Sequence, residues 1–209
     1  MIKLAVFGAG RIGYVHALNA ASLPSVRLEY IVDPIPSAHL DDLATKTGAR
    51  VVEADTVFAD PSIDLVVVPT PNPTHAPLAR AALEAGKHVV TANKALLATY
   101  GNEIFDAAQK KGVTVAFEAA VAGGIPIIKA LREGLTANRI EWIAGIINGT
   151  TNFILSEMRD KGLPFAEVLK EAQALGYAEA DPTFDIEGVD AAHKATLMAS
   201  IAFGVPVQF

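Results

Sequence analysis

The segment Ile2-Lys-Leu-Ala-Val-Phe7, followed at once by Gly8-Ala-Gly10-Arg-Ile-Gly13, decides the fold of this chain. The apolar run predicts a buried parallel strand, and the Gly-x-Gly-x-x-Gly pattern behind it predicts a tight turn that opens a helix. Such a turn lets backbone N–H groups approach a pyrophosphate, although it can also serve only to pack a helix on a strand. We expect a dinucleotide site formed by Gly8, Gly10, Arg11, Ile12 and Gly13.

An acidic residue follows this pattern at the distance typical of dinucleotide-binding domains, about 20 positions on. Asp33 ends the second apolar run, Leu28–Val32, where a carboxylate can accept hydrogen bonds from the ribose hydroxyls of the adenosine. The same carboxylate repels a 2′-phosphate, so the sequence favours NAD over NADP. A plain capping role for Asp33 is the alternative.

Strands and helices alternate along the first part of the chain, which predicts an α/β fold with a Rossmann-type doubly wound parallel sheet. The expected strands are Ile2–Phe7, Leu28–Val32, Leu65–Val68, His88–Val90 and Val113–Phe117. The expected helices are Arg11–Ser22, Ser37–Lys46, Thr74–Ala85 and Leu96–Lys110, and Gly48, Gly86 and Gly112 are placed as C-terminal cap glycines. We expect a dinucleotide-binding domain over residues 1–118.

The remaining residues, 119–209, predict a partial α+β substrate domain. After a small-residue hinge we expect a helix at Ile127–Leu135, a strand at Arg139–Ile147 and three helices at Asn152–Lys161, Phe165–Leu175 and Val189–Phe203. Trp142 and Phe153 are expected in its core. One strand makes no sheet, so this domain is expected to be incomplete at its C-terminal side, with weak or absent turnover.

Composition excludes several classes of protein. The chain has 209 residues, a formal net charge of −6 and no cysteine. The negative charge argues against nucleic-acid binding, and the lack of cysteine excludes disulfides and thiolate chemistry. No apolar run approaches the ~20 residues that span a bilayer, and no signal-peptide pattern is present. We therefore expect a cytoplasmic protein that binds neither nucleic acid nor membrane.

Two resemblances meet in mid-chain. Residues 1 to about 90 resemble the inositol dehydrogenase and glucose–fructose oxidoreductase family, through Gly8–Asn19, Ala59-Asp-Pro-Ser-Ile-Asp64 and Thr70-Pro-Asn-Pro-Thr-His-Ala76. That family continues with Glu-Lys-Pro after Ala85-Gly-Lys-His-Val89, whereas this chain continues with Thr91-Ala-Asn-Lys94. Oxidation of a polyol or sugar, as in that family, is therefore an alternative function. The absence of the Glu-Lys-Pro motif from this chain counts against it.

From Gly86 onward the chain is similar to the homoserine dehydrogenases. The matching motifs are Thr91-Ala-Asn-Lys94, Phe117-Glu-Ala-Ala-Val-Ala-Gly-Gly-Ile-Pro126, Ile147-Asn-Gly-Thr-Thr-Asn152, and Ala174-Leu-Gly-Tyr-Ala-Glu-Ala-Asp-Pro182 through Lys194. The two resemblances join at Ala85–Val89, a pattern expected of a natural or artificial chimera that is truncated at its C-terminus. The resemblance implies an oxidoreductase of threonine and methionine biosynthesis that interconverts L-homoserine and L-aspartate 4-semialdehyde with NAD(P).

The resemblance also implies roles for individual residues. Lys194 would transfer the proton, with Lys94 beside it at the nicotinamide end of the cofactor, where two ammonium groups would lower each other's pKa. Glu179 and Asp190 would bind the amino-acid substrate, and Asp185 either orients the lysine or caps the last helix. Asp190 and Lys194 lie four residues apart on one helical face, where a surface ion pair is the alternative.

Further positions follow from the same family. Thr70 and Gly176 match positions near the cofactor, although Thr70 is equally explained as the turn at the end of a strand. The backbone carbonyls of Glu118, Val121, Gly123 and Ile125 resemble a sodium-binding segment, and a hinge without an ion explains the same residues. The resemblance implies a homodimer for the complete enzyme. A dinucleotide-binding module without turnover is the remaining alternative.

Overall fold

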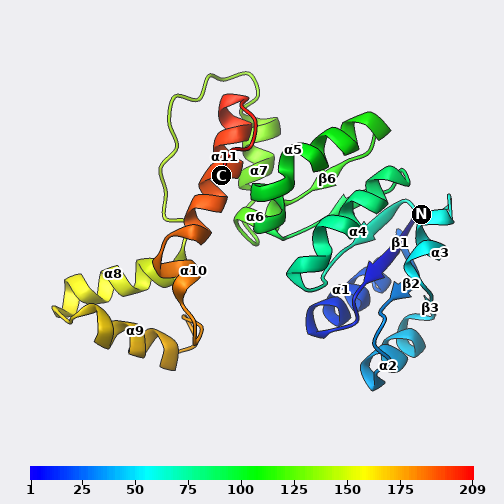
Figure 1. Cartoon of the computed structure of the whole chain (residues 1–209), viewed down its shortest axis with the longest axis horizontal. Coiled ribbons are helices and arrows are strands. Elements are labelled where there is room, and N and C mark those ends of the chain that lie inside the picture. Colours follow the sequence, from blue (N-terminus) through cyan, green and yellow to red (C-terminus); the bar gives the residue numbers. More distant parts are fainter. The chain divides into compact units, whose positions relative to one another are not determined.

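The computed structural model describes residues 1–209 and divides the chain into two compact units, Met1–Ala120 and Val121–Phe209. The first unit holds every β-strand, and the second consists of helices joined by irregular segments (Figure 1). The boundary falls within α6 (Glu118–Val121), close to the division that the sequence predicts after residue 118.

The first unit is built on a six-stranded sheet with the order β3-β2-β1-β4-β5-β6, and every neighbouring pair is parallel. The predicted doubly wound parallel sheet is therefore confirmed. Its strands are β1 (Ile2–Phe7), β2 (Val26–Val32), β3 (Arg50–Val51), β4 (Leu65–Val67), β5 (His88–Val90) and β6 (Val115–Ala116). Strand β3 was not predicted, because its two exposed residues form no apolar run.

Helices follow the strands as predicted, with small shifts at their ends. They are α1 (Arg11–Ala21), α2 (Ala38–Thr47), α3 (Ala54–Ala59), α4 (Asn72–Glu84) and α5 (Lys94–Lys111), of which only the short α3 was not predicted. Ser37 and Asn93 cap α2 and α5 with their side chains, and Gly48 and Gly112 end these helices in the left-handed conformation. No helix of the chain is both long and apolar enough to cross a membrane.

The strand order places the glycine pattern at a special point of the sheet. Strand β1 lies between β2 and β4, so the chain moves in one direction from β1 and in the opposite direction from β4. Right-handed crossovers then put α1 and α4 on opposite faces of the sheet. The loop after β1 therefore lies at the topological switch point, where doubly wound sheets bind their ligands.

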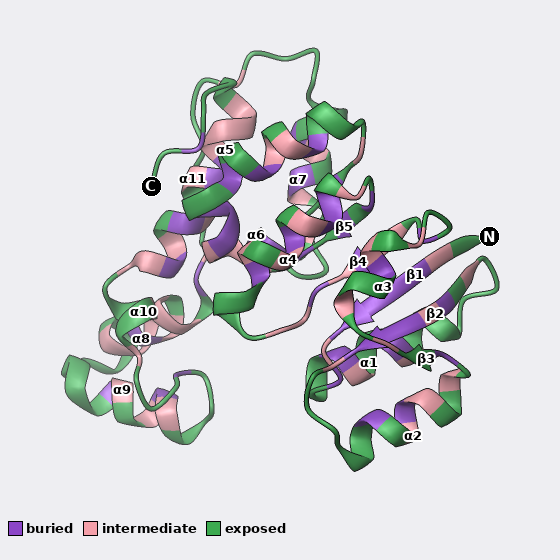
Figure 2. Cartoon of the chain, turned by 45° about the vertical axis from the view of Figure 1, so that its right-hand side comes forward, coloured by how far each residue is buried: buried purple, intermediate pink, exposed green.

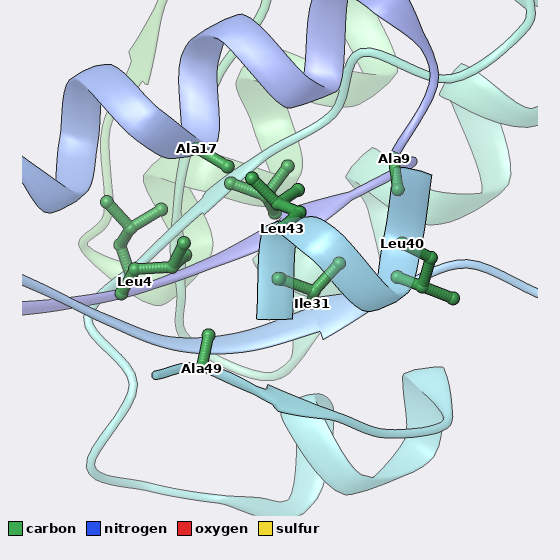
Figure 3. Close-up of a cluster of buried hydrophobic side chains, with 9 residues drawn as sticks. Leu4, Ala9, Ala17, Ile31, Leu40, Leu43 and Ala49 are labelled. Atoms are coloured by element: carbon green, nitrogen blue, oxygen red, sulfur yellow. The ribbon is translucent and has the colours of Figure 1, made fainter. Parts of the chain in front are cut away.

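The core beside this loop is apolar and closely packed. Leu4 of β1 and Ile31 of β2 pack with Ala17 of α1 and Leu43 of α2 (Figure 3). The inner parts of β1 and β2 are buried along their length, while α2 is buried on one side only (Figure 2). Burial at this density fixes the carboxyl ends of β1 and β2, and with them the turns that follow.

The second unit contains α7 (Ile127–Lys129), the π-helical turn η1 (Ala130–Gly134), α8 (Gly149–Lys161), α9 (Phe165–Ala174), α10 (Thr183–Ile186) and α11 (Val189–Phe203). Helices α8 and α9 pack side by side (Figure 1) around Ile154, Val168 and Ala172. The three long helices predicted for this region are thus confirmed, and Phe153 packs against this small core as expected.

The strand predicted at Arg139–Ile147 is wrong. Residues 139–147 form no regular structure, and most of them are exposed. A strand needs a neighbouring strand to satisfy its backbone groups, and no other segment of the second unit is extended beside this one. The second unit is therefore helical rather than α+β. Trp142, expected in the core, is 73% exposed.

The exposure of Trp142 generates a direct test, because it is the one tryptophan of the chain. Its fluorescence should show the red-shifted emission of a hydrated indole and strong quenching by acrylamide. Chymotrypsin should also cleave the folded protein at Trp142 before it cleaves the buried aromatic residues of the first unit. Blue-shifted emission with weak quenching would contradict the placement of this segment.

Candidate dinucleotide and amino-acid sites

The dinucleotide loop combines a strained turn with an open helix end. Gly8 has φ of +100° and its N–H donates to the carbonyl oxygen of Val32 at 2.7 Å. Gly10 is the N-cap of α1, and no side chain caps this helix. The first-turn N–H groups of α1 therefore stay available to an anion, which the positive end of the helix dipole also favours. The side chains of Arg11 and Ile12 are exposed beside them.

Gly8, Gly10 and Gly13 differ in the space that a side chain would have at each position. A Cβ atom built on Gly13 would lie 1.9 Å from the carbonyl oxygen of Gly8, so only glycine fits there. A Cβ atom on Gly8 would approach the carbonyl oxygen of Pro69 to 3.2 Å, which ties the loop to the end of β4. A Cβ atom on Gly10 would meet nothing within 4 Å. The space beside Gly10 is thus empty, as close approach of a ligand to the backbone requires.

Asp33 fixes the second side of the loop. Its Oδ2 accepts a hydrogen bond from the N–H of Ala9 at 2.7 Å, and its Oδ1 accepts one from Ile35 at 2.9 Å. The carboxylate therefore links the glycine loop to the turn after β2. A carboxylate has about four lone-pair positions, so two remain for hydroxyl donors of a ligand.

Thr70 and Lys94 follow the next two strands of the same sheet. The carbonyl oxygen of Thr70 lies 2.6 Å from Nε2 of the buried His75, while the buried hydroxyl of Thr70 has no hydrogen-bond partner. Lys94 is the first residue of α5, half-buried, directly after Asn93. The Asn93 side chain caps α5 and donates to Asn72 at 2.7 Å, which fixes the backbone at Lys94.

The second unit gathers a polar cluster from three helices. Nδ2 of Asn148 donates to Oδ1 of Asp185 at 2.8 Å and to Oδ2 of Asp190 at 2.9 Å. The same Oδ2 of Asp190 lies 2.7 Å from Nζ of Lys194. Asn148 precedes α8, Asp185 belongs to α10, and the other two belong to α11. Two predicted substrate residues and the predicted proton-transfer residue are thus brought together.

Lys194 is held by two acceptors. Besides Asp190, the carbonyl oxygen of Ile147 accepts a hydrogen bond from Nζ at 2.7 Å. The side chains of Lys194 and Asp190 are 17% and 8% exposed, so this contact is not the solvated surface pair that was the alternative. Two of the hydrogens on the lysine nitrogen have fixed directions, and the remaining tetrahedral position is fixed by them.

The other predicted positions are more loosely placed. Glu179 is exposed, and its backbone carbonyl oxygen accepts a hydrogen bond from Gln173 at 3.1 Å. Gly176 has φ of +75° in the turn after α9. Asp185 does not cap α11, which begins at Val189 with Gly188 as its N-cap and has no side-chain cap, so the capping alternative for Asp185 is wrong.

The segment proposed for sodium lies in and after α6. Glu118 and Val121 are its terminal residues, and Gly123 and Ile125 follow it. The carbonyl oxygen of Ile125 accepts a hydrogen bond from the N–H of Ile127 at 2.8 Å, which leaves one of its lone pairs for another partner. No group of three or more His, Asp or Glu side chains is arranged to hold a metal ion.

Asn148 is the cluster residue that the sequence expectations did not single out. Its side chain caps α8, with Oδ1 accepting from the N–H of Thr151 at 2.8 Å. An asparagine ahead of Gly149-Thr-Thr151 is a typical N-cap signal, and this signal alone predicts the cap. Its contacts with Asp185 and Asp190 span 37 and 42 residues of sequence, which no local pattern reveals.

Family models match the two parts of the chain. Residues 2–119 match the model described as an oxidoreductase family with an NAD-binding Rossmann fold, and residues 126–209 match the homoserine dehydrogenase model. The first match ends at residue 119 and the second begins at residue 126, close to the division of the fold after Ala120. The fold and the glycine loop, together with the first of these matches, place the chain in a broad class of proteins, the NAD-binding oxidoreductases of the Rossmann type.

Individual proteins that match most of the chain identify a narrower family within this class. A homoserine dehydrogenase from Pseudomonas aeruginosa is 68% identical over 166 residues, which is 78% of this chain and 38% of that protein. The structure of a homoserine dehydrogenase from Thiobacillus denitrificans has a TM-score of 0.83 at 54% identity, over 99% of this chain and 50% of that one.

The structure of a putative homoserine dehydrogenase from Archaeoglobus fulgidus has a TM-score of 0.79 at 33% identity. The match covers 97% of this chain and 68% of the other. The chain belongs to the homoserine dehydrogenase family. It spans 38% of the Pseudomonas protein and 50% of the Thiobacillus chain.

The glycine geometry predicts opposite effects for two alanine substitutions. Gly13→Ala should destabilise the first unit by about 3 kcal/mol or more, because its Cβ would collide with a backbone oxygen. Gly10→Ala should leave stability within about 0.5 kcal/mol, because its backbone is unstrained and its surroundings are empty. Gly10→Ala should nevertheless weaken dinucleotide binding. Thermal denaturation and cofactor titration measure both effects, and equal melting temperatures for the two variants would contradict the geometry.

Proposed function

We propose that the chain carries the cofactor and substrate groups of an NAD(P)-dependent homoserine dehydrogenase, which interconverts L-homoserine and L-aspartate 4-semialdehyde. The observation that carries the proposal is the placement of Lys194, with Nζ 2.7 Å from both Asp190 and the carbonyl oxygen of Ile147. These residues lie within 126–209, the part that matches the homoserine dehydrogenase model.

The first unit is proposed to hold the dinucleotide through Gly8, Gly10, Gly13 and the N-terminus of α1. The empty space at Gly10 and the uncapped helix fit a pyrophosphate. When bound, the nicotinamide ring supplies the acceptor for the hydride of the substrate. Thr70 is proposed to meet the cofactor with its unpartnered hydroxyl, and family resemblance supports the same role for Arg11, Ile12, Lys94 and Gly176.

NAD is proposed as the preferred cofactor because the negative charge of the Asp33 carboxylate would repel the 2′-phosphate of NADP. The chain is also similar to a hyperthermophilic archaeal homoserine dehydrogenase solved in complex with NADPH, at 27% identity and a TM-score of 0.79, over 98% of this chain and 70% of the other. That neighbour binds the phosphorylated cofactor, so the proposed preference of this chain for NAD rests on the charge of Asp33.

The second unit is proposed to bind the amino-acid substrate. Asp185, Asp190 and Lys194 together carry a net charge of −1, which favours a ligand with a cationic group. The ammonium group of homoserine fits this requirement, and the exposed carboxylate of Glu179 supplies a further acceptor for it.

Lys194 is proposed to exchange the proton of the substrate hydroxyl. As a neutral amine it would use both N–H groups on Asp190 and Ile147, so that its lone pair faces the third direction and accepts the hydroxyl proton. As an ammonium it would carry a hydrogen in that direction and return it to the aldehyde oxygen in the reverse reaction. The two acceptors thus orient Lys194 in the same way whether it acts as a neutral base or as a protonated acid.

Family resemblance supports three further proposals. Lys94 would act at the nicotinamide end of the cofactor, the carbonyl oxygens of Glu118, Val121, Gly123 and Ile125 would bind sodium, and the complete enzyme would form a homodimer in the cytoplasm.

A second candidate function is a dinucleotide-binding module that does not oxidise homoserine, which the exposed, unpaired segment 137–147 favours. Homoserine-dependent formation of NADH separates the two functions.

The proposed role of Lys194 predicts the effect of its removal. Lys194→Ala should lower kcat for homoserine about 10²–10⁴-fold, while the affinity for NAD changes little. Lys161→Ala is the matched control, because it removes a lysine from the far end of α8, where it pairs with Glu171. Turnover measured by NADH absorbance decides the prediction, and near-parental turnover of Lys194→Ala would overturn the assignment.

The charge of Asp33 predicts the cofactor preference. The protein should bind NADH more tightly than NADPH, and Asp33→Asn should shift the ratio of the two affinities about tenfold toward NADPH, since one repulsive charge is removed. Asp41→Asn removes the same charge from the nearby helix α2 and should leave the ratio unchanged. Fluorescence titration with both reduced cofactors measures the ratios, and an unchanged ratio in Asp33→Asn would count against the role of this carboxylate.

A further inference from the structure

We propose that Asn148 is a positioning residue that sets the direction in which Lys194 exchanges its proton. This inference rests on the proposed function and adds to it a residue that touches neither cofactor nor reacting atoms. Asn148 acts on both acceptors of Lys194, because its side chain binds Asp190 and its peptide bond contains the carbonyl group of Ile147.

The amide of Asn148 is fully used and has one possible orientation. Nδ2 donates one hydrogen to Asp185 and the other to Asp190, at 2.8 and 2.9 Å. Oδ1 accepts from the N–H and the hydroxyl of Thr151, at 2.8 and 2.9 Å. Carboxylates only accept and a backbone N–H only donates, so exchanging the amide oxygen and nitrogen would break these contacts. The residue is 8% exposed, which protects the arrangement from water.

The bond to Asp190 reaches Lys194 through a single atom. Oδ2 of Asp190 accepts from Asn148 and from Lys194, so the position of this oxygen decides where the lysine nitrogen lies. The second acceptor, the carbonyl oxygen of Ile147, is held in place because Asn148 is the N-cap of α8. Movement of Asn148 would therefore displace both acceptors together and turn the third position on the nitrogen away from the substrate.

The bridge also opposes a repulsion. Asp185 and Asp190 are like charges that both lie within hydrogen-bond distance of one nitrogen atom. Two carboxylates so close repel each other unless donors lie between them. The amide hydrogens of Asn148 supply those donors without adding charge, which preserves the net charge of −1 that the substrate ammonium requires.

A simple capping role for Asn148 makes a different prediction, and the two can be separated by substitution. Asparagine, aspartate and serine are about equally good N-caps. Asn148→Ser and Asn148→Asp should therefore both keep α8 capped, and circular dichroism should show a folded protein. Serine cannot reach the two carboxylates, and aspartate adds a third carboxylate in place of the donors. A capping role predicts parental behaviour for both variants, whereas positioning predicts a loss in both, larger for Asn148→Asp.

The first readout needs no substrate. Proton exchange on the Lys194 ammonium is measured by nitrogen-15 NMR of the complete chain, with Lys194→Arg to assign the signal. Exchange should be slow in the parent and roughly tenfold faster in Asn148→Ser, as expected for the loss of one hydrogen bond. Lys161→Ala should not change it. Parental exchange in both Asn148 variants would overturn the proposal.

The second readout is homoserine oxidation. Asn148→Ser should lower kcat about 10²-fold through misalignment while the KM for NAD stays within a factor of two or so. If the parent chain binds NAD but does not oxidise homoserine, the proposed function fails, and the NMR comparison alone decides the positioning role. If the parent oxidises homoserine and Asn148→Ser keeps its kcat, the positioning role fails while the proposed function stands.

Discussion

The contact on which the site depends is the pair formed by the Lys194 ammonium and the Asp190 carboxylate, 2.7 Å apart and largely shielded from water. Removing two charges from water costs several kcal/mol per ion unless further hydrogen bonds satisfy the remaining donors and acceptors. Ile147 and Asn148 provide those bonds. The hydrogen bonds that stabilise this buried ion pair therefore hold α8, α10 and α11 together. Because burying such a pair is energetically costly, its presence indicates a role in the chemistry of the site.

The dinucleotide side follows a different principle, because backbone geometry rather than charge organises it. Gly13 lies so close to Gly8 that no side chain fits between them, while Gly10 faces empty space. Asp33 ties the same loop to the end of β2. The same carboxylate is proposed to set the choice of cofactor, so its substitution is expected to affect both the loop and the cofactor preference. Comparing affinity ratios rather than single affinities separates the two effects.

Most of the first unit could be predicted from the sequence because its signals are local. Buried strands such as Ile2–Phe7 appear as apolar runs, and Gly48 and Gly112 mark helix ends. The predictions that failed concerned features that depend on residues far apart in the sequence. The apolar segment at Arg139–Ile147 looked like a strand, but a strand depends on a partner that periodicity does not reveal. Asn148 showed only its capping signal, whereas its contacts with Asp185 and Asp190 depend on how three helices meet.

The central claim is that this chain moves a hydride from homoserine to a nicotinamide while Lys194 takes the hydroxyl proton. Isotope transfer tests it most directly. The protein is incubated with NAD and homoserine deuterated at the carbon that bears the hydroxyl group, and the reduced cofactor is examined by mass spectrometry. The account predicts one deuterium in the reduced nicotinamide, and none with Lys194→Ala on the same timescale. Unlabelled reduced cofactor, or no reduced cofactor from a chain that binds NAD, would contradict it.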